Sequence, residues 1–234
     1  MDTLHDYEVD YMSASVADTA MLFPNAIHLL DQYGLDYCCQ GKQSFFEACL
    51  NAGLQPETIW SELQEANQVP LVHRMKFETW DPNLLIDFIL QHHHAYVRES
   101  IPQLQGLLDK VCEVHGLDSP YLLEVRDTFR ALADELLNHL PKEEEIVFPA
   151  IRKILVSGDA GTSFVQTPVQ VMEHEHDRAG EWVKKLRKLT QQYTPPASAC
   201  PTFQMTYKLL REFDQDLIQH IHLENNLLFP NVKV

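Results

Sequence analysis

One motif occurs twice in this chain of 234 residues, and it constrains the fold more than any other feature. Both copies read H-x3-E-x4-F-P, and they cover residues 139–149 and 220–230. A His and a Glu four residues apart project from one face of a helix, so each copy can direct an imidazole nitrogen and a carboxylate oxygen at a single metal centre. Two copies with the same Phe-Pro end indicate an internal duplication. The ligand candidates in the two copies are His139, Glu143, His220 and Glu224.

Helix signals dominate the chain after residue 75. Gly is scarce, at 8 residues, and most of the 13 Pro stand where a helix would begin or a loop would run. The dipeptides Asp81-Pro82, Ser119-Pro120 and Thr167-Pro168 are typical of helix starts. The predicted helices cover residues 81–114, 119–156, 167–192 and 202–229. We therefore expect an all-α protein with an up-and-down four-helix bundle in residues 76–234.

The first part of the chain has a different character. Residues 1–75 contain only short helical segments, which predicts a small helical N-terminal domain that precedes the bundle. The segments are expected at residues 15–23, 24–33, 44–51 and 56–66. Between the second and third of them lies a vicinal cysteine pair, Cys38-Cys39.

Each half of a duplicated bundle should supply another ligand from a helix upstream of its motif. His94 and His176 lie on apolar helical stripes that face the core, whereas His92 and His174 share faces with polar residues. His93 is a reserve candidate, although the run of His92 and His93 is expected to be solvated. The intervals agree as well, since 139 − 94 = 45 and 220 − 176 = 44. A single His on such a stripe is more often a core residue, but agreement in two halves favours ligation.

The predicted ligand set suits a dinuclear centre better than a tetrahedral zinc site. Each metal would take two His, and the two Glu would bridge. Imidazole and carboxylate without thiolate favour two non-haem iron ions, with manganese second. Bridging leaves open positions, where an oxo bridge and dioxygen or nitric oxide could bind. The six predicted ligands are His94, His139, Glu143, His176, His220 and Glu224.

Further polar residues stand near these ligands. Glu135 and Asp216 lie one turn before His139 and His220, and Glu175 precedes His176; each could orient an imidazole, line a polar route inward or simply face solvent. Pro141 interrupts the first ligand pair, and a local bulge there would restore the facing of its neighbours. The remaining histidines are expected at the surface or in loops: His5, His28, His73 and His115.

These motifs resemble the iron-sulfur cluster repair di-iron proteins, the repair-of-iron-centres branch of the hemerythrin-like bundles. The resemblance rests on Phe23-Pro24, on the segment from Leu35 to Lys42, and on residues 139–149, 171–180 and 220–230. It implies a di-iron centre held by the six ligands above, with bridging carboxylates and with Glu135 and Glu175 on a polar route to the irons. It also implies that Cys38 and Cys39 belong to a functional N-terminal domain. The chain departs from the family at Gln40, where Gly is usual, and at Pro141.

The cysteine pair has its own chemistry. Adjacent cysteines rarely form an unstrained disulfide, and nearby Gly41 and Lys42 favour accessible thiols with a lowered pKa. Such thiols could take up iron, trap nitric oxide or exchange with a partner; two buried structural thiols are the alternative. The other cysteines look incidental: Cys49, Cys112 and Cys200.

Composition excludes several classes of protein. The formal charge is 18 − 34 = −16 and no basic stretch occurs, so nucleic acid is not expected as a partner. No segment has the pattern of a signal peptide or the length of a membrane span, and the odd cysteine count fits reduced thiols, so we expect a cytoplasmic protein.

Two functions from different classes follow. The first is repair of iron-sulfur clusters damaged by nitric oxide or oxidants, with damaged iron-sulfur proteins as partners; reduction of nitric oxide at the irons is a candidate enzymatic component. The second is a hemerythrin-like module that binds or senses dioxygen or nitric oxide. A ferritin-like ferroxidase is disfavoured because the predicted site is rich in histidine. The sequence leaves a homodimer open.

Overall fold

The structure is a computed structural model that describes residues 10–68, 75–157 and 163–232. The chain separates into two compact units, Met1–Thr79 and Trp80–Val234. Helices make up the regular structure of both units, and the described residues form no strand. The predicted fold class, a helical bundle preceded by a small helical unit, is confirmed.

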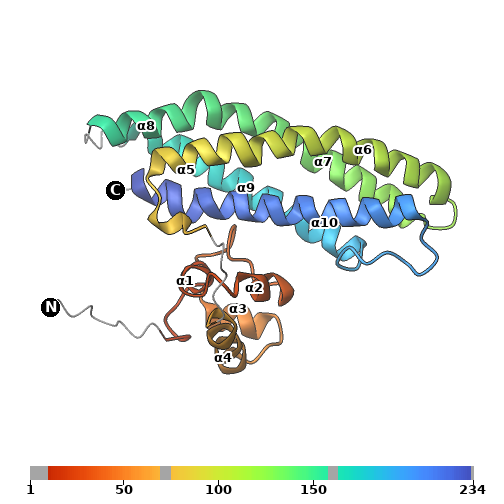
Figure 1. Cartoon of the computed structure of the whole chain (residues 1–234), viewed down its shortest axis with the longest axis horizontal. Coiled ribbons are helices and arrows are strands. Elements are labelled where there is room, and N and C mark those ends of the chain that lie inside the picture. The colour runs from red at the N-terminus through yellow and green to blue at the C-terminus, as the bar shows by residue number, and fades with distance from the viewer. Residues whose placement is uncertain (1–9, 69–74, 158–162, 233–234) are drawn as a thin grey trace. The chain divides into compact units, whose positions relative to one another are not determined.

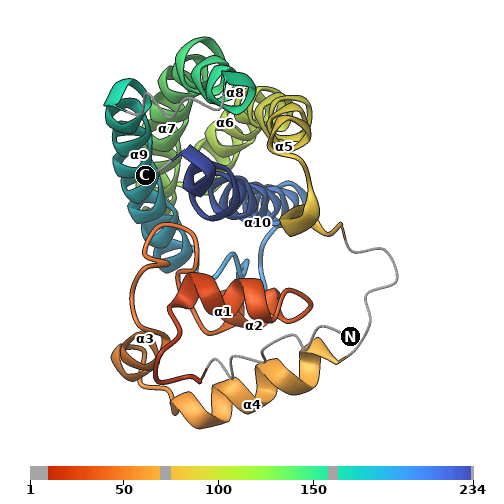
Figure 2. The same ribbon diagram turned by 90° about the vertical axis from the view of Figure 1, so that its left-hand side faces the viewer.

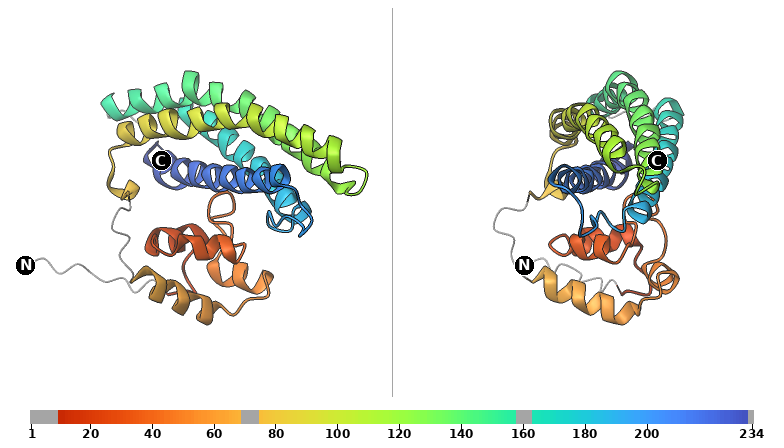
Figure 3. Two further views of the ribbon diagram at one scale, coloured as in Figure 1. Left: turned by 45° about the vertical axis from the view of Figure 1, so that its right-hand side comes forward. Right: turned by 90° about the vertical axis from the view of Figure 1, so that its right-hand side faces the viewer.

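The second unit is built from four long helical rods. Figure 1 shows α6, α7, α9 and α10 side by side along their length, and Figures 2 and 3 show the same grouping from other directions. The first rod consists of α5 (Pro82–Phe88), η2 (Ile89–His94) and α6 (Ala95–His115). The second consists of α7 (Tyr121–Lys142), η3 (Glu143–Val147) and α8 (Phe148–Ser157). The third is α9 (Ser163–Leu189), and the fourth consists of α10 (Pro201–His222), η4 (Leu223–Leu228) and η5 (Phe229–Val232).

Helix signals in the sequence locate most of these rods. The Asp81 carboxylate caps α5 by accepting a hydrogen bond from the Asn83 backbone N–H at 2.8 Å, and Gly116 ends α6. The start predicted for the third rod is wrong, because α9 begins at Ser163 and Pro168 lies inside it. A proline in the second turn removes only one intrahelical hydrogen bond, which a helix of 27 residues tolerates.

The first unit packs short helices around one tryptophan. Trp60 meets the edges of Phe23 and Phe45 at ring-centroid distances of 4.8 and 5.3 Å. The helices are α1 (Val16–Leu22), α2 (Ile27–Gln32), α3 (Phe45–Asn51), α4 (Pro56–Asn67) and η1 (Phe77–Thr79). Aromatic packing of this kind lets a unit with few long helices bury a core.

The bundle core is apolar except at a few positions. Away from the histidine cluster, a buried ion pair joins α9 to α10: Arg187 donates Nε–H and an Nη–H to the two oxygens of Asp214 at 2.6 and 2.7 Å. Asp214 is 3% exposed. A buried carboxylate is tolerated only when it is paired in this way, so the pair fixes how the two helices pack.

We predict that Asp214→Ala destabilises the protein by about 3 kcal/mol, because Arg187 then keeps a largely desolvated charge without its partner. The free energy of unfolding from urea denaturation measures the effect. Glu212→Ala is the matched control, since Glu212 lies on the same helix but is exposed and pairs loosely with Lys208 at 3.7 Å. Equal losses in the two variants would contradict the assignment.

Candidate metal centre

Each of the three rods that contain η2, η3 and η4 changes from α-helix to π-helix at its candidate ligands. The segments are η2 (Ile89–His94), η3 (Glu143–Val147) and η4 (Leu223–Leu228). A π-helical turn contains an extra residue, and such turns are frequent at functional sites because they re-aim side chains. The segment η3 follows Pro141, where the sequence predicts a bulge. Because η4 forms without an internal proline, the ligand region itself favours the π conformation, with or without Pro141.

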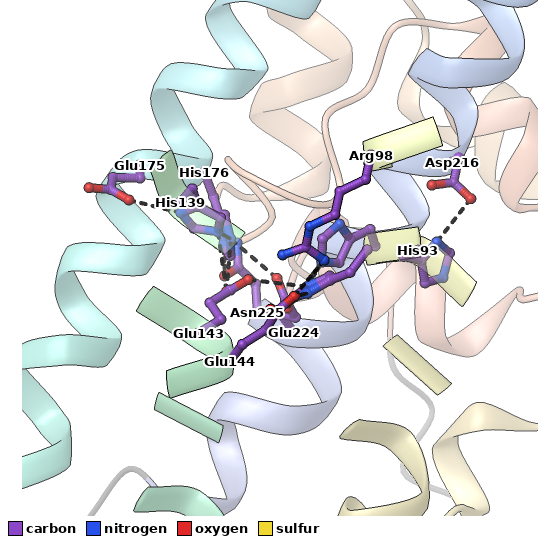
Figure 4. Close-up of polar contacts among 12 residues, drawn as sticks. His93, Arg98, His139, Glu143, Glu144, Glu175, His176, Asp216, Glu224 and Asn225 are labelled. Atoms are coloured by element: carbon purple, nitrogen blue, oxygen red, sulfur yellow. Dashed lines mark hydrogen bonds and ion pairs between the residues drawn. The ribbon is translucent and has the colours of Figure 1, made fainter. Parts of the chain in front are cut away.

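The six predicted ligands lie together in the bundle core (Figure 4 shows most of them). They form two groups of potential ligand atoms, each within 4.8 Å of one another, and the two carboxylates belong to both groups. The first group is His94, His220, Glu143 and Glu224; the second is His139, His176, Glu143 and Glu224. The Nε2 atoms of His94 and His220 are 3.2 Å apart, and those of His139 and His176 are 3.1 Å apart.

Both carboxylates extend from one histidine pair to the other. Glu143 places Oε2 at 3.4 Å from His94 Nε2 and Oε1 at 3.2 Å from His139 Nε2. Glu224 places Oε1 at 3.1 Å from His220 Nε2 and Oε2 at 3.2 Å from His176 Nε2. Each glutamate therefore offers one oxygen to each pair, which is the arrangement of a carboxylate that bridges two metal ions.

The chemistry of the donors fits a pair of cations. Glu143 and Glu224 are both 0% exposed. Neither oxygen of Glu143 accepts a hydrogen bond in the part of the chain that the structure describes, and nor does Oε2 of Glu224, although imidazole nitrogens lie close by. Buried carboxylate oxygens without donors are costly unless a cation or a well-aligned donor compensates them. A metal ion at each histidine pair would supply that compensation.

Electrostatics keep the carboxylates ionised. Burial alone would raise the pKa of Glu143, but the charge of His139 and the facing imidazoles outweigh it and hold the pKa well below the usual range. For Glu224, burial and the charge of Glu143 are outweighed by His220 and His176, which lower its pKa to about 2. Ionised carboxylates and imidazoles together are the ligand set of hard to borderline metals such as iron.

Polar partners on the outer side orient three of the four imidazoles. His94 Nδ1 contacts Glu144 Oε1 at 2.7 Å, His139 Nδ1 contacts Glu175 Oε2 at 2.8 Å, and His176 Nδ1 contacts Asn225 Oδ1 at 2.9 Å. Each acceptor selects the tautomer with a proton on Nδ1, which leaves Nε2 free to ligate. The partners are themselves held, since Arg98 pairs with Glu144 at 2.8 Å and Lys142 pairs with Glu175.

Two of these partners, Glu144 and Asn225, were not predicted from the sequence. Each follows one of the two shared glutamates, and each bonds to the upstream histidine of its own half of the duplication. The repeated motif could have indicated both partners, because the residue after its Glu has a side chain that accepts hydrogen bonds in both copies.

The structure shows which contacts are made by the three outer residues whose roles the sequence left open. Glu175 orients His139 rather than its neighbour His176. The Glu135 carboxylate accepts from Trp182 Nε1 at 3.0 Å and pairs with Arg178, so it does not reach His139. Asp216 contacts His93 Nδ1 at 2.9 Å instead of His220.

The other histidines separate into several environments. The expectation that His93 is solvated is wrong: it is 0% exposed, whereas His92 is exposed. His28 is exposed, and half-buried His115 contacts Cys200 Sγ at 3.3 Å. His5 and His73 lie outside the described residues.

The cysteine pair lies in a loop organised by one carboxylate. Asp36 Oδ1 accepts the backbone N–H groups of Cys38 and Cys39 at 3.2 and 2.9 Å, and the two Sγ atoms are 3.3 Å apart as free thiols. The expectation of a lowered pKa is wrong for Cys38, because its contact with Cys39 and its burial raise the pKa. Cys39 is partly exposed. Gly41 is required, since a Cβ there would lie 2.5 Å from the Tyr37 carbonyl oxygen.

Gln40 does not disturb the loop. Its φ angle is negative, so the position where the family usually has Gly does not need one in this chain. The side chain of Gln40 is exposed.

We predict that Glu143→Gln lowers the amount of metal bound per chain by more than about half, because the loss of one shared carboxylate charge weakens both candidate ion positions at once. Metal analysis after anaerobic loading and gel filtration measures the ratio. Glu145→Gln is the matched control, since Glu145 is exposed on the same π segment. Retention of both ions in Glu143→Gln would show that this residue is not a shared ligand.

We also predict that Glu175→Ala weakens iron binding about 10- to 100-fold, because His139 loses the acceptor that fixes its tautomer. Glu175→Gln should restore most of the affinity, since an amide oxygen can accept from Nδ1. Competition with a chelator of known affinity measures the change. Equal affinities of the Ala variant and the unchanged chain would contradict the orienting role.

Comparisons with known proteins show what the chain is similar to. Residues 85–232 match the family model of the hemerythrin HHE cation binding domain, and residues 12–67 match ScdA_N, described as a domain of unknown function. The chain is 36% identical over 225 residues to the iron-sulfur cluster repair protein YtfE of Yersinia pseudotuberculosis serotype IB, and equally to that of Yersinia pestis strain Pestoides F. Each alignment covers 95% of this chain and 97% of the relative. Among the described residues, no helix combines the length and apolar character needed to cross a membrane.

Proposed function

The chain belongs to the hemerythrin-like iron-sulfur cluster repair proteins, and from this membership we propose that it helps to restore iron-sulfur clusters damaged by oxidative or nitrosative stress. Relatives that align with almost the whole chain carry the repair name, which supports the role. The observation that supports it most directly is the pair of buried carboxylates that extend between two histidine pairs. Carboxylates in this arrangement can hold two metal ions next to each other.

The proposed cofactor is a pair of non-haem iron ions. Nitrogen and oxygen donors without thiolate favour iron, with manganese second. The proposed terminal ligands are His94 and His220 for one ion and His139 and His176 for the other. Glu143 and Glu224 would bridge. When bound, the iron pair would supply redox chemistry and open positions for small ligands such as nitric oxide or dioxygen.

The protein side chains prepare this centre in three ways. Glu144, Glu175 and Asn225 hold the Nδ1 atoms of their histidines, so that Nε2 faces inward. Burial of the ligands excludes bulk water. We further propose that Glu135 and Glu175, which are only 12% and 14% exposed as side chains, line a polar route to the centre.

Reduction of nitric oxide is the proposed enzymatic component, because it requires two small molecules held close together.

The N-terminal unit is proposed to contribute thiol chemistry. Partly exposed Cys39 is the thiol that a partner can reach, and buried Cys38 lies 3.3 Å from it, so that the pair could relay iron or react with nitric oxide. We propose residues 1–75 as the thiol domain and residues 76–234 as the di-iron domain, with damaged iron-sulfur proteins as partners. We also propose a cytoplasmic location; a homodimer would be compatible with this role.

A second function is favoured by the same bundle. The hemerythrin match covers residues 85–232, and a centre that only binds dioxygen or nitric oxide would need nothing outside that range. The cysteine pair at the centre of the N-terminal match, residues 12–67, favours repair over simple binding. The two functions differ in whether the thiols are needed.

Anaerobic loading with ferrous iron followed by a repair assay tests the proposal. The chain is incubated with an enzyme whose iron-sulfur cluster has been damaged by nitric oxide, and recovery of that enzyme's activity is measured. We predict full recovery with about two ions per chain, and loss of recovery in His139→Ala. His174→Ala is the control, since His174 is an exposed histidine on the same helix as His176.

A double variant, Cys38→Ala/Cys39→Ala, separates the two functions. We predict that it keeps its iron but loses repair. Full recovery by the iron-free chain would contradict the repair proposal. Reversible binding of dioxygen without any recovery would favour the binding module instead.

A further inference from the structure

The two halves of the duplicated centre differ at one position. Position by position, His94 corresponds to His176, so the residue before each is His93 in one half and Glu175 in the other. Glu175 accepts a hydrogen bond from His139. His93 makes no such bond to His220; its ring instead stacks on the ring of His220 with centroids 5.4 Å apart and planes 3° apart.

The replacement creates a second cluster of metal-binding side chains beside the first. His92, His93 and Asp216 bring a nitrogen or oxygen atom each to within 4.8 Å of one another. His93 Nδ1 lies 2.9 Å from Asp216 Oδ1 (Figure 4). His92 is exposed but held, because its ring stacks on Phe88 with centroids 4.9 Å apart. The three side chains therefore have defined places rather than free rotation in solvent.

Polar atoms of this cluster lack partners. Among the residues that the structure describes, His93 Nε2 and Asp216 Oδ2 are buried and bond to nothing, and His220 Nδ1 is in the same state. Buried polar atoms in proteins are nearly always satisfied, so these unsatisfied atoms on His93, on Asp216 and on the stacked His220 point to an ion or water as a partner. The side chain of His93 is 0% exposed, which excludes satisfaction by bulk solvent.

We propose that His92, His93 and Asp216 form a third metal site, which binds one divalent transition-metal ion at the rim of the centre. Two imidazoles and one carboxylate are the ligands that ferrous iron takes in non-haem proteins. Burial increases from exposed His92 through Asp216 to buried His93, so an ion can enter from solvent. That the ion is iron rests on the proposed function. Through the stack of His93 on His220, the rim site lies one imidazole away from the buried pair.

Equilibrium dialysis of the full chain against ferrous iron under anaerobic conditions tests the proposal. We expect about three ions per chain at saturation, two bound tightly and one more weakly because it is partly exposed. His92→Gln and Asp216→Asn should each reduce the count to about two. His174→Gln and Glu212→Gln are matched controls, since they change an exposed His and an exposed acid elsewhere on α9 and α10 and should keep the third ion.

Each outcome supports or overturns the rim site separately from the buried centre. Saturation at about two ions in the unchanged chain, as expected if a water occupies the rim, would overturn it. Retention of the third ion in His92→Gln would also overturn the rim site. This variant is expected to fold normally, because the side chain of His92 is exposed. Failure of the buried centre alone would instead remove the two tight ions and leave a weak one that still depends on His92.

Discussion

Burial of two carboxylates inside a helical bundle is the constraint on which the rest of this structure depends. Glu143 and Glu224 are fully buried and only 3.1 to 3.4 Å from the nearest imidazoles. Two like charges in an apolar core are unfavourable unless positive charge lies between or around them. The two histidine pairs provide the place for that positive charge. The outer acceptors and the π-helical turns orient the side chains around it. Without the four histidines, the same helices would bury these two acids at a large electrostatic cost.

The fold and the six ligand candidates could be anticipated from the sequence because both depend on spacing. Proline and glycine mark where helices begin and end, and the repeated motif fixes the relation of His to Glu. The start of α9 could not be anticipated, since Pro168 favours the first turn of a helix, whereas here a helix of 27 residues tolerates the loss of one hydrogen bond in its second turn. The burial of His93 was missed because a 3.6-residue period does not hold across a π-helical segment.

Contacts between distant segments account for the remaining differences. The pairing of Glu175 with His139 joins α9 to α7, and nothing local in either segment specifies it. Burial of Cys38 likewise depends on how the N-terminal helices pack, so its raised pKa could not be read from a nearby lysine. Glu144 and Asn225 are the exception, since the alignment of the two repeats points to both.

The π-helical segments also limit which insertions and deletions the spacing of the candidate ligands tolerates. One residue in an α-helix corresponds to a rotation of about 100° and a rise of about 1.5 Å, so each segment sets both the direction and the height of its ligands. A one-residue insertion or deletion between two ligand positions on the same rod would turn one of them away from the core. Such a change within the second or fourth rod would separate a His from its Glu, whereas the same change in a connection between rods would leave that spacing intact.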